Sequence, residues 1–338
     1  SRSGYHSSHS IRKQCDPLRF TIAEKGERGR PEMHSRCRKV LIKICQTQFP
    51  FSMPKTLFGG LDLQLPNVAT VPQYSPFRYP GGKSRWYPFV EHWMLAVQPE
   101  TFVEPFAGGA HAGLAVGIER LSGEVVIVEI DDNVSAVWKT ILNGDAGWLM
   151  DRIENFEMSR ENAEEMLDLK DRSPRDRAFA MIVHNRVSRG GITAPGAGWM
   201  KKGEKGKGLS SRWYPDTLVD RIGEIAEAKD RIRFVHGDGM GVAKRYVRDE
   251  NAAFFIDPPY PKAGGRLYEH SDVDHEAIFE FAASTSGRVL LTYDDSDEIE
   301  GLLEKFEMES EELIVSTTHH TEKKELLIGK DLRWLANV

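Results

Sequence analysis

Cysteine is scarce in this chain and confined to one end of it. The 338 residues include three cysteines, Cys15, Cys37 and Cys45. Everything after Cys45 therefore has neither disulfides nor thiolate metal ligands. The spacing of the three matches no zinc-binding pattern, and we expect no metal site.

Long apolar runs are also missing. No stretch approaches the roughly 18 to 20 apolar residues that a membrane-spanning helix needs, and the N-terminus lacks the apolar core of a secretory signal. We expect no membrane association and a cytoplasmic location. With 40% apolar residues, the chain can still bury the core of one large α/β domain with an inserted module.

A basic excess, common in proteins that bind nucleic acids, is absent from the chain as a whole. The formal net charge is -6, yet residues 1–55 hold 12 Lys/Arg against 4 Asp/Glu, so the remainder is clearly acidic. Any surface that contacts a polyanion must therefore be local.

The first 52 residues differ in character from the rest of the chain. They are rich in Ser and Arg, and their one short apolar run is 40–42. We expect 1–52 to be a basic, disordered extension and Met53 to be the native start. The alternative is a small basic arm that touches nucleic acid.

Beyond about residue 85, strand and helix patterns alternate, which favours βαβ units and a mainly parallel sheet. Helices are expected at about 110–121 and 134–142, and charged helical segments at 145–230 read as an inserted module between two halves, 53–144 and 231–338. The last two expected strands form an antiparallel pair across the turn 319–324. The seven expected strands are 101–104, 124–129, 231–235, 252–256, 288–293, 312–317 and 325–328.

A glycine-rich turn follows the first of these strands. The segment Glu104-Pro105-Phe106-Ala107-Gly108-Gly109 lies between the strand and a helix, where glycines permit close approach of a nucleotide-like ligand and the helix offers free amide donors. It is not the Gly-x-Gly-x-x-Gly of dinucleotide-binding proteins, which argues against a nicotinamide dehydrogenase. A glycine turn without a ligand is the alternative.

An acid closes the second strand. Glu129 lies some 20 residues past the turn, where a carboxylate would bind a ribose diol. Asp238, after the third strand, falls at the same sheet edge and would meet the adenine end of the ligand. The alternative is that Glu129, Asp131 and Asp132 are solvated acids that cap the next helix.

The most specific motif is Asp257-Pro258-Pro259-Tyr260, directly after the apolar strand 252–256. Two prolines stiffen the loop, so Asp257 and the Pro258 carbonyl can be fixed as acceptors, while Tyr260 offers a ring for stacking. Two acceptors on the hydrogens of a conjugated amine favour the pyramidal geometry that attack on a methyl sulfonium requires. The alternative is a strand that ends at a rigid turn.

Together these motifs resemble the Dam-type (alpha-group) family of adenine-specific DNA methyltransferases over about residues 74–335. The family's aromatic-Pro-Gly-Gly-Lys segment is matched by 79–83, its Glu-Pro-Phe-x-Gly by 104–108 and its last motif by 257–260. Glu129 stands where Asp is more usual. The resemblance implies a class I S-adenosylmethionine-dependent methyltransferase fold, α/β and Rossmann-like, with a mostly parallel seven-stranded sheet and a helical target-recognition insert at 145–230.

The resemblance also implies the roles of individual residues. Asp257, Pro258, Pro259 and Tyr260 would be catalytic. The cofactor S-adenosylmethionine would be bound by Tyr79, Gly81, Gly82, Lys83, Glu104, Pro105, Phe106, Gly108, Gly109, Glu129, Ile130 and Asp238. Double-stranded DNA would be contacted by Arg78, Asn185, Arg189, Lys201, Lys202 and Arg212.

The insert departs from the family pattern, because its loop lacks the tyrosine- and asparagine-rich version associated with GATC recognition. It carries the one dense basic cluster beyond residue 55, Lys201, Lys202, Lys205, Lys207 and Arg212. This cluster suits phosphates, although each lysine taken singly is as well explained as part of a solvated loop. His319, His320, Lys323 and Lys324 form a second basic turn, expected near DNA.

The function expected is methylation of the N6 amine of an adenine flipped out of duplex DNA, by a cytoplasmic, nucleoid-associated enzyme. We expect a monomer or a weak dimer, with a cognate restriction endonuclease as a candidate partner. The alternatives are an RNA adenine methyltransferase, a DNA cytosine-N4 methyltransferase, and a DNA-binding homologue that has lost catalysis.

Overall fold

The computed structural model describes residues 63–78, 82–193, 198–201, 208–261, 273–316 and 322–337. The expected extension 1–52 lies outside this part, as do Tyr79, Gly81, Lys202, Lys205, Lys207, His319 and His320. All described residues belong to one compact unit, Thr56–Val338.

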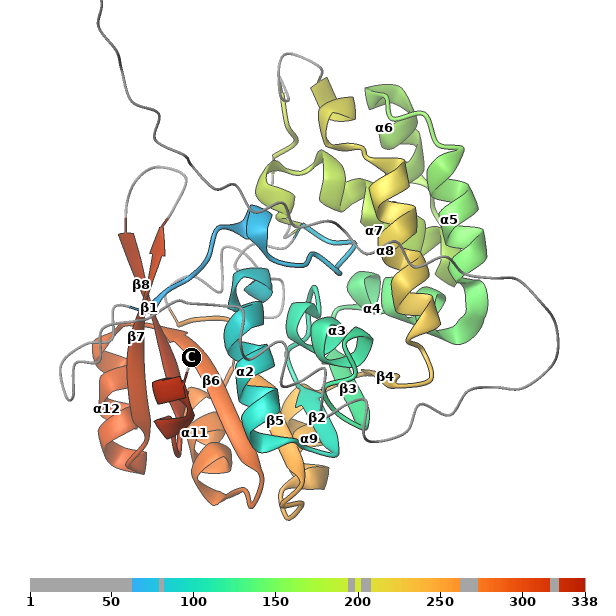
Figure 1. Cartoon of the computed structure of the whole chain (residues 1–338). Helices are drawn as coiled ribbons and strands as arrows, with labels where there is room; N and C mark the ends of the chain where they lie inside the picture. The colour runs from blue at the N-terminus through green and yellow to red at the C-terminus, as the bar shows by residue number, and fades with distance from the viewer. Residues whose placement is uncertain are drawn as a thin grey trace, which may run out of the picture. The chain divides into compact units, whose positions relative to one another are not determined.

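A single sheet organises this unit (Figure 1), in the order β1-β7-β8-β6-β5-β2-β3-β4 among the described residues. The strands are β1 (Leu63–Gln64), β2 (Thr101–Glu104), β3 (Glu124–Glu129), β4 (Ile232–His236), β5 (Ala252–Ile256), β6 (Arg288–Asp294), β7 (Glu309–Ser316) and β8 (Glu322–Gly329).

Strands β2 to β6 run parallel, and β8 lies antiparallel between β6 and β7. This is the sheet of class I methyltransferases, so the expected fold class is confirmed. The two-residue β1, which pairs parallel to β7, adds a strand that the sequence did not predict.

The terminal hairpin differs from its expected bounds. Strands β7 and β8 pair from Glu309 with Gly329 to Ser316 with Glu322, so both are longer than expected. Lys323 and Lys324 therefore belong to a strand and not to a basic turn. The exposed ammonium of Lys324 pairs with Glu312 across the hairpin at 2.7 Å, because diagonal neighbours on one face of an antiparallel pair are within reach of long side chains.

The major helices precede, connect and follow the strands. They are α2 (Tyr87–Val97), α3 (His111–Ile118), α4 (Asp132–Thr140), α5 (Ala146–Glu154), α6 (Arg160–Asp168), α7 (Pro174–Val187), α8 (Pro215–Glu227), α9 (Gly239–Ala243), α11 (His275–Ser284) and α12 (Asp297–Phe306). The short helical turns are η1 (Val68–Thr70), η2 (Lys83–Trp86), η3 (Ile141–Asp145), η4 (Arg189–Gly191), η6 (Gly208–Arg212), η7 (Lys244–Tyr246) and η8 (Arg333–Asn337).

Apolar side chains point alternately to the two faces of the sheet, so the core consists of two clusters, one on each face. Val125 and Ile127 of β3 join the cluster of α2, α3 and α4, whereas Val126 and Val128 join that of α9, α11 and α12. Successive side chains of a strand point to opposite faces, and helices that cover both faces keep the strands almost wholly apolar. The carboxyl ends of the strands consequently remain as the edge where polar side chains gather.

The segment expected as an insert is helical, and α5 to α8 account for most of it. Its core is continuous with one face of the sheet, since Phe179 and Ile222 belong to the same buried cluster as Leu114 of α3. Phe156, Phe179 and Trp213 meet edge to face within it. None of the helices in the described ranges is long and apolar enough to cross a membrane.

Two loops at the carboxyl edge approach each other closely at Gly239. A Cβ atom added there would lie 1.9 Å from the carbonyl oxygen of Pro105. Only glycine therefore allows the start of α9 to contact the turn that follows β2.

We predict that Gly239→Ala lowers the free energy of unfolding by about 1–3 kcal/mol, because the added methyl group must push two backbones apart. Gly301→Ala is the matched control. Its added Cβ would meet nothing within 4 Å in helix α12, so it should be neutral or stabilise by up to about 1 kcal/mol. Urea unfolding of both variants measures the difference, and equal stability of the two would contradict the close approach.

Candidate active site

The glycine turn after β2 is held in place by hydrogen bonds from side chains of β3 and α4. Gly108 takes a left-handed conformation, with φ at 48°. Its N–H donates to Oε2 of Glu129 at 2.9 Å, and its carbonyl accepts from Nε1 of Trp138 at 3.0 Å. Pro105, Phe106 and Gly109 lie in the same turn. The backbone between β2 and α3 is thus fixed in an open loop at the sheet edge.

Glu129 ends β3 directly beside this turn. Its carboxylate is almost fully buried, and besides Gly108 it accepts from the backbone N–H groups of Ile130 and Asp131 at 2.7 and 2.8 Å. Burial raises its pKa, while these donors act in the opposite direction. Each carboxylate oxygen has two acceptor positions, so capacity for a ligand hydroxyl remains.

The neighbours of Glu129 fit the base end of a nucleoside. The side chain of Ile130 is 49% exposed and gives an apolar surface at the strand end. Asp238 follows β4, which pairs with β3, and its side chain accepts from the N–H of Met240 at the start of α9. The structure therefore brings Glu129, Ile130 and Asp238 to one edge, as their sequence positions suggested.

Glu104, the last residue of β2, lies beneath the turn and is 3% exposed. Its Oε2 accepts from the N–H of Gly113 at 2.7 Å. Burial raises the pKa of this carboxyl to about 8, with a smaller contribution from the charge of Asp257, while backbone donors act against it. Through this hydrogen bond the side chain of Glu104 holds α3 against β2.

Lys83, the first residue of η2, contacts the loop that follows β5. It is 5% exposed, and its ammonium lies 3.0 Å from Oδ1 of Asp257 and 2.8 Å from the hydroxyl of Tyr260. Asp257 Oδ1 also accepts from the hydroxyl of Thr292 on β6 at 2.6 Å. The structure therefore brings Lys83, Asp257 and Tyr260 together from positions far apart in sequence.

These contacts set the ionisation of the loop. Burial raises the pKa of Asp257, and the ammonium of Lys83 and the hydroxyl of Thr292 oppose this rise. Burial and the nearby charges of Asp257 and Glu325 raise the pKa of Tyr260 well above its ordinary value, so its phenol stays protonated. The Tyr260 ring stacks on Tyr293, with centroids 5.9 Å apart.

Glu325 is a component of the site that sequence reasoning missed. It lies on β8, is 7% exposed, and its Oε2 is 3.7 Å from the ammonium of Lys83. Lys83 thus lies between the half-buried carboxylate of Asp257 and the buried carboxylate of Glu325. A single glutamate in the alternating pattern of a strand carries no signal of this position, because it becomes visible only when β8 is inserted beside β6.

The residues expected to contact DNA differ in their exposure to solvent. Asn185 is 1% exposed, and its side-chain amide accepts from the N–H of Arg78 and donates to the carbonyls of Arg78 and Gly191. It therefore fixes the segment that carries Arg78, and a DNA contact of its own stays a prediction. Arg189 and Lys201 are exposed, and Arg212 is half-buried in η6.

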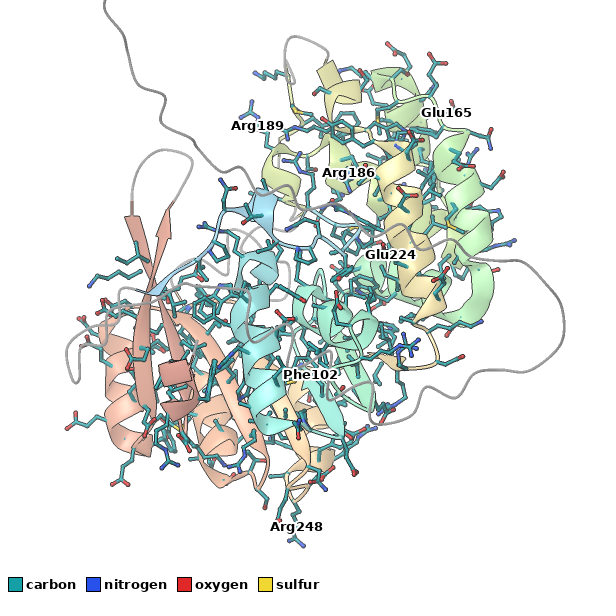
Figure 2. The ribbon with its side chains drawn as sticks, viewed as in Figure 1. Phe102, Glu165, Arg186, Arg189, Glu224 and Arg248 are labelled. Carbon is teal, nitrogen blue, oxygen red and sulfur yellow. The ribbon has the colours of Figure 1, made fainter. Side chains whose placement is uncertain are left out.

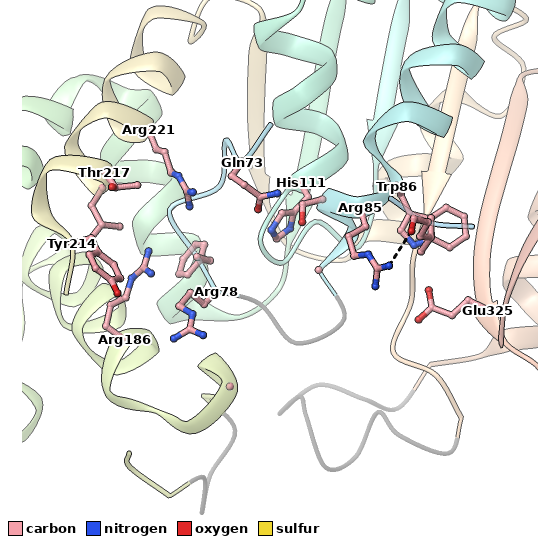
Figure 3. A pocket seen from close by; sticks show the side chains of 16 residues that line it. Gln73, Arg78, Arg85, Trp86, His111, Arg186, Tyr214, Thr217, Arg221 and Glu325 are labelled. Carbon is pink, nitrogen blue, oxygen red and sulfur yellow. Dashed lines mark hydrogen bonds between the residues drawn. The ribbon is translucent and has the colours of Figure 1, made fainter. Parts of the chain in front are cut away.

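A cleft of about 540 Å³ adjoins this site (Figure 3). It extends from Gly82, Trp86 and Glu325 on the catalytic side to Arg186 and Tyr214 on the helical insert. Arg78 and His111 lie between the two ends. The cleft therefore extends from Glu325, which lies 3.7 Å from the ammonium of Lys83, to the segment predicted to recognise the substrate.

Comparison with solved structures returns methyltransferases of low similarity. An rRNA methyltransferase, aviRa from Streptomyces viridochromogenes, shares 13% identity at a TM-score of 0.34, covering 75% of this chain and 86% of its own. An O-methyltransferase from Bacillus cereus in complex with SAH shares 11% identity at 0.32, covering 77% and 84%. The Bacillus subtilis tRNA methyltransferase TrmK shares 12% identity at 0.32, covering 74% and 67%.

No protein-family model and no curated protein sequence matches the chain. At TM-scores of this size, the structural neighbours assign no activity to it. The chemistry open to the site depends on its own residues. It offers a half-buried carboxylate with a lysine and a tyrosine at the end of β5, and a second carboxylate beside a glycine turn at the ends of β2 and β3.

We predict that Lys83→Met destabilises the fold by up to about 3–5 kcal/mol at neutral pH, since Asp257 and Glu325 both lose this cation. The loss should be smaller at pH 5 than at pH 8. Without Lys83 the pKa of Asp257 rises further above its unfolded value, so the folded form prefers the neutral acid, and stability declines as pH rises. Urea unfolding at both pH values measures this.

Two further variants test the cause. The double variant Lys83→Met with Glu325→Gln should regain part of the loss, because one of the two carboxylates that faced the lysine is then neutral. Lys305→Met removes an exposed ion pair with Glu276 and should cost no more than about 1 kcal/mol. A pH-independent loss in Lys83→Met would show that packing, and not charge, accounts for its effect.

Proposed function

We propose that this protein transfers a methyl group from S-adenosylmethionine to the exocyclic N6 amine of an adenine flipped out of double-stranded DNA, as a member of the Dam-type family. The observation that supports this most is the contact of Lys83 with Asp257 and Tyr260. It joins the aromatic-Pro-Gly-Gly-Lys segment and the Asp-Pro-Pro-Tyr segment, two motifs of that family, in one site.

The residues around Glu129 fit the proposed cofactor. The carboxylate is oriented by three backbone donors and retains one acceptor position, on Oε2, for a ribose hydroxyl, while Ile130 offers an apolar surface for the adenine ring. Gly108 keeps the turn clear of side chains. When bound, the cofactor supplies an electrophilic methyl group on its sulfonium sulfur.

Asp257 would accept a hydrogen bond from the N–H of the adenine amine. The lone pair of this amine is delocalised into the ring, so an acceptor on its N–H favours the pyramidal form that can attack the methyl group. The base must leave the DNA stack to reach a loop at the sheet edge. Tyr260 would stack on the flipped base, and catalysis would come from positioning the two reactants.

We predict that Asp257→Ala lowers methyl transfer to duplex DNA by about 10²–10³-fold, because the amine loses its oriented acceptor. Transfer of a labelled methyl group from S-adenosylmethionine to duplex DNA, followed by sequencing of the modified DNA, measures rate and position. Asp297→Ala is the matched control, since this aspartate is exposed in the first turn of α12.

Binding of S-adenosylhomocysteine, measured by calorimetry, checks that Asp257→Ala still folds and retains the cofactor site. Undiminished transfer by Asp257→Ala would refute its catalytic role. Methylation of RNA or of the cytosine N4 amine, with no modified adenine in DNA, would replace the proposed substrate by one of those alternatives. Cofactor binding without transfer to any of them would indicate a homologue that has lost catalysis.

A further inference from the structure

The cleft beside the catalytic loop carries more positive charge than the sequence motifs predicted. Four arginines line it, and of the described residues around it Glu325 is the single carboxylate. We call it the arginine cleft. Its arginines are Arg78, Arg85, Arg186 and Arg221.

Arg186 is the most deeply placed of these cations. It lies near the end of α7, is 5% exposed, and donates through Nη2 to the carbonyl of Pro76. Its buried Nε atom has no hydrogen-bond partner among the described residues. Burial, together with the charges of Arg221, Arg78 and Arg212, lowers the pKa of Arg186 to about 9. A guanidinium in these surroundings lacks an anion.

Arg221 comes from α8 and approaches the same region (Figure 3). Its Nη1 donates to the carbonyl of Ser75 at 2.9 Å, which fixes the guanidinium at the cleft wall. Burial lowers its pKa, and only the more distant charge of Glu224 opposes this. In the described part of the chain, no carboxylate lies within ion-pair distance of Arg186 or Arg221.

Two guanidiniums anchored to adjacent carbonyls, Ser75 and Pro76, and facing one cleft form a preorganised site for an oxyanion. Buried charges in proteins are normally paired, so the missing counter-charge points to a ligand. Planar guanidiniums bind phosphate oxygens in pairs of hydrogen bonds, which a lysine cannot do.

We propose that Arg186 and Arg221 together bind one phosphodiester group of the DNA strand that carries the target base. Neither arginine belongs to the Lys201–Arg212 cluster that the sequence analysis singled out. The inference deepens the function proposed above, on which the choice of DNA rests. A strand held at this end of the cleft would pass Arg78 and reach the side lined by Glu325 and Trp86, next to Lys83.

Phosphate contacts have a measurable signature in the dependence of affinity on salt. Each neutralised phosphate releases condensed counterions, so the plot of log affinity against log salt loses about 0.9 in slope for each contact removed. This readout reports binding alone. It is independent of methyl transfer and of which base is modified.

We predict that Arg221→Gln weakens binding of a fluorescein-labelled 20-base-pair duplex by about tenfold at 0.15 M salt and lowers the salt slope by up to about 0.9, since Arg186 still contacts the same phosphate. Arg221→Lys should recover most of the slope but little of the affinity, because it keeps the charge and loses the planar fork. Fluorescence anisotropy over a range of salt concentrations measures both quantities.

Arg248→Gln is the matched control. Arg248 is exposed and precedes β5, at the amino-terminal edge of the sheet, and Figure 2 shows it far from Arg186. The affinity and the slope should stay at the wild-type values in this variant. Asp257→Ala should also keep the wild-type slope, since its carboxylate is not part of the phosphate site.

Several results would overturn the inference. These are an unchanged slope in Arg221→Gln, an equal loss in Arg248→Gln, or an Arg221-dependent interaction with RNA or with free phosphate but not with duplex DNA. The two proposals fail in different ways. An Arg221-dependent slope on DNA without adenine methylation would refute the proposed function and leave this site standing, whereas methylation with an unchanged slope would do the reverse.

Discussion

The ammonium of Lys83 holds the candidate active site together. It contacts Asp257 and Tyr260 in the loop after β5 and lies near Glu325 on β8, so three segments that are remote in sequence meet at one buried cation. An ion pair this deep gains little over an apolar core, because two charges must leave water. Its importance lies in the effect of its loss, because Asp257 and Glu325 would both lose a contact with the same cation.

The sheet explains why these segments can meet at all. Parallel strands point their carboxyl ends to one edge, so Glu104, Glu129 and Asp257, which lie at or directly after the ends of β2, β3 and β5, fall on a common border. The strand cores are apolar and covered by helices on both faces, which leaves this border as the place for polar chemistry.

Much of this arrangement could be predicted from the sequence. The seven main strands, the antiparallel last pair and the glycine turn beside Glu129 depend on local patterns, such as apolar runs that end at an acid or a proline. Periodicity and turn chemistry record such features within a few residues. The α/β class with a mainly parallel sheet followed from the order of these elements along the chain, whereas the methyltransferase type of this fold was implied by the family resemblance.

The parts that could not be predicted depend on contacts between distant segments. Glu325 is one glutamate in a strand of mixed polarity, and only its insertion beside β6 places it near Lys83. Arg186 and Arg221 are ordinary helical arginines in sequence, and their carbonyl partners at Pro76 and Ser75 lie more than a hundred residues away. Asn185 was expected at a base, yet backbone groups of Arg78 and Gly191 occupy its amide.

The position of the arginines is compatible with the polyanionic substrate proposed for this acidic protein. A net charge of -6 would repel DNA at long range, but physiological salt screens exposed charges beyond about 8 Å. Contacts within a cleft are screened much less. The chain therefore needs no basic surface to bind DNA, provided that its cations are concentrated where the DNA backbone passes. The net charge of the sequence does not reveal such a local concentration.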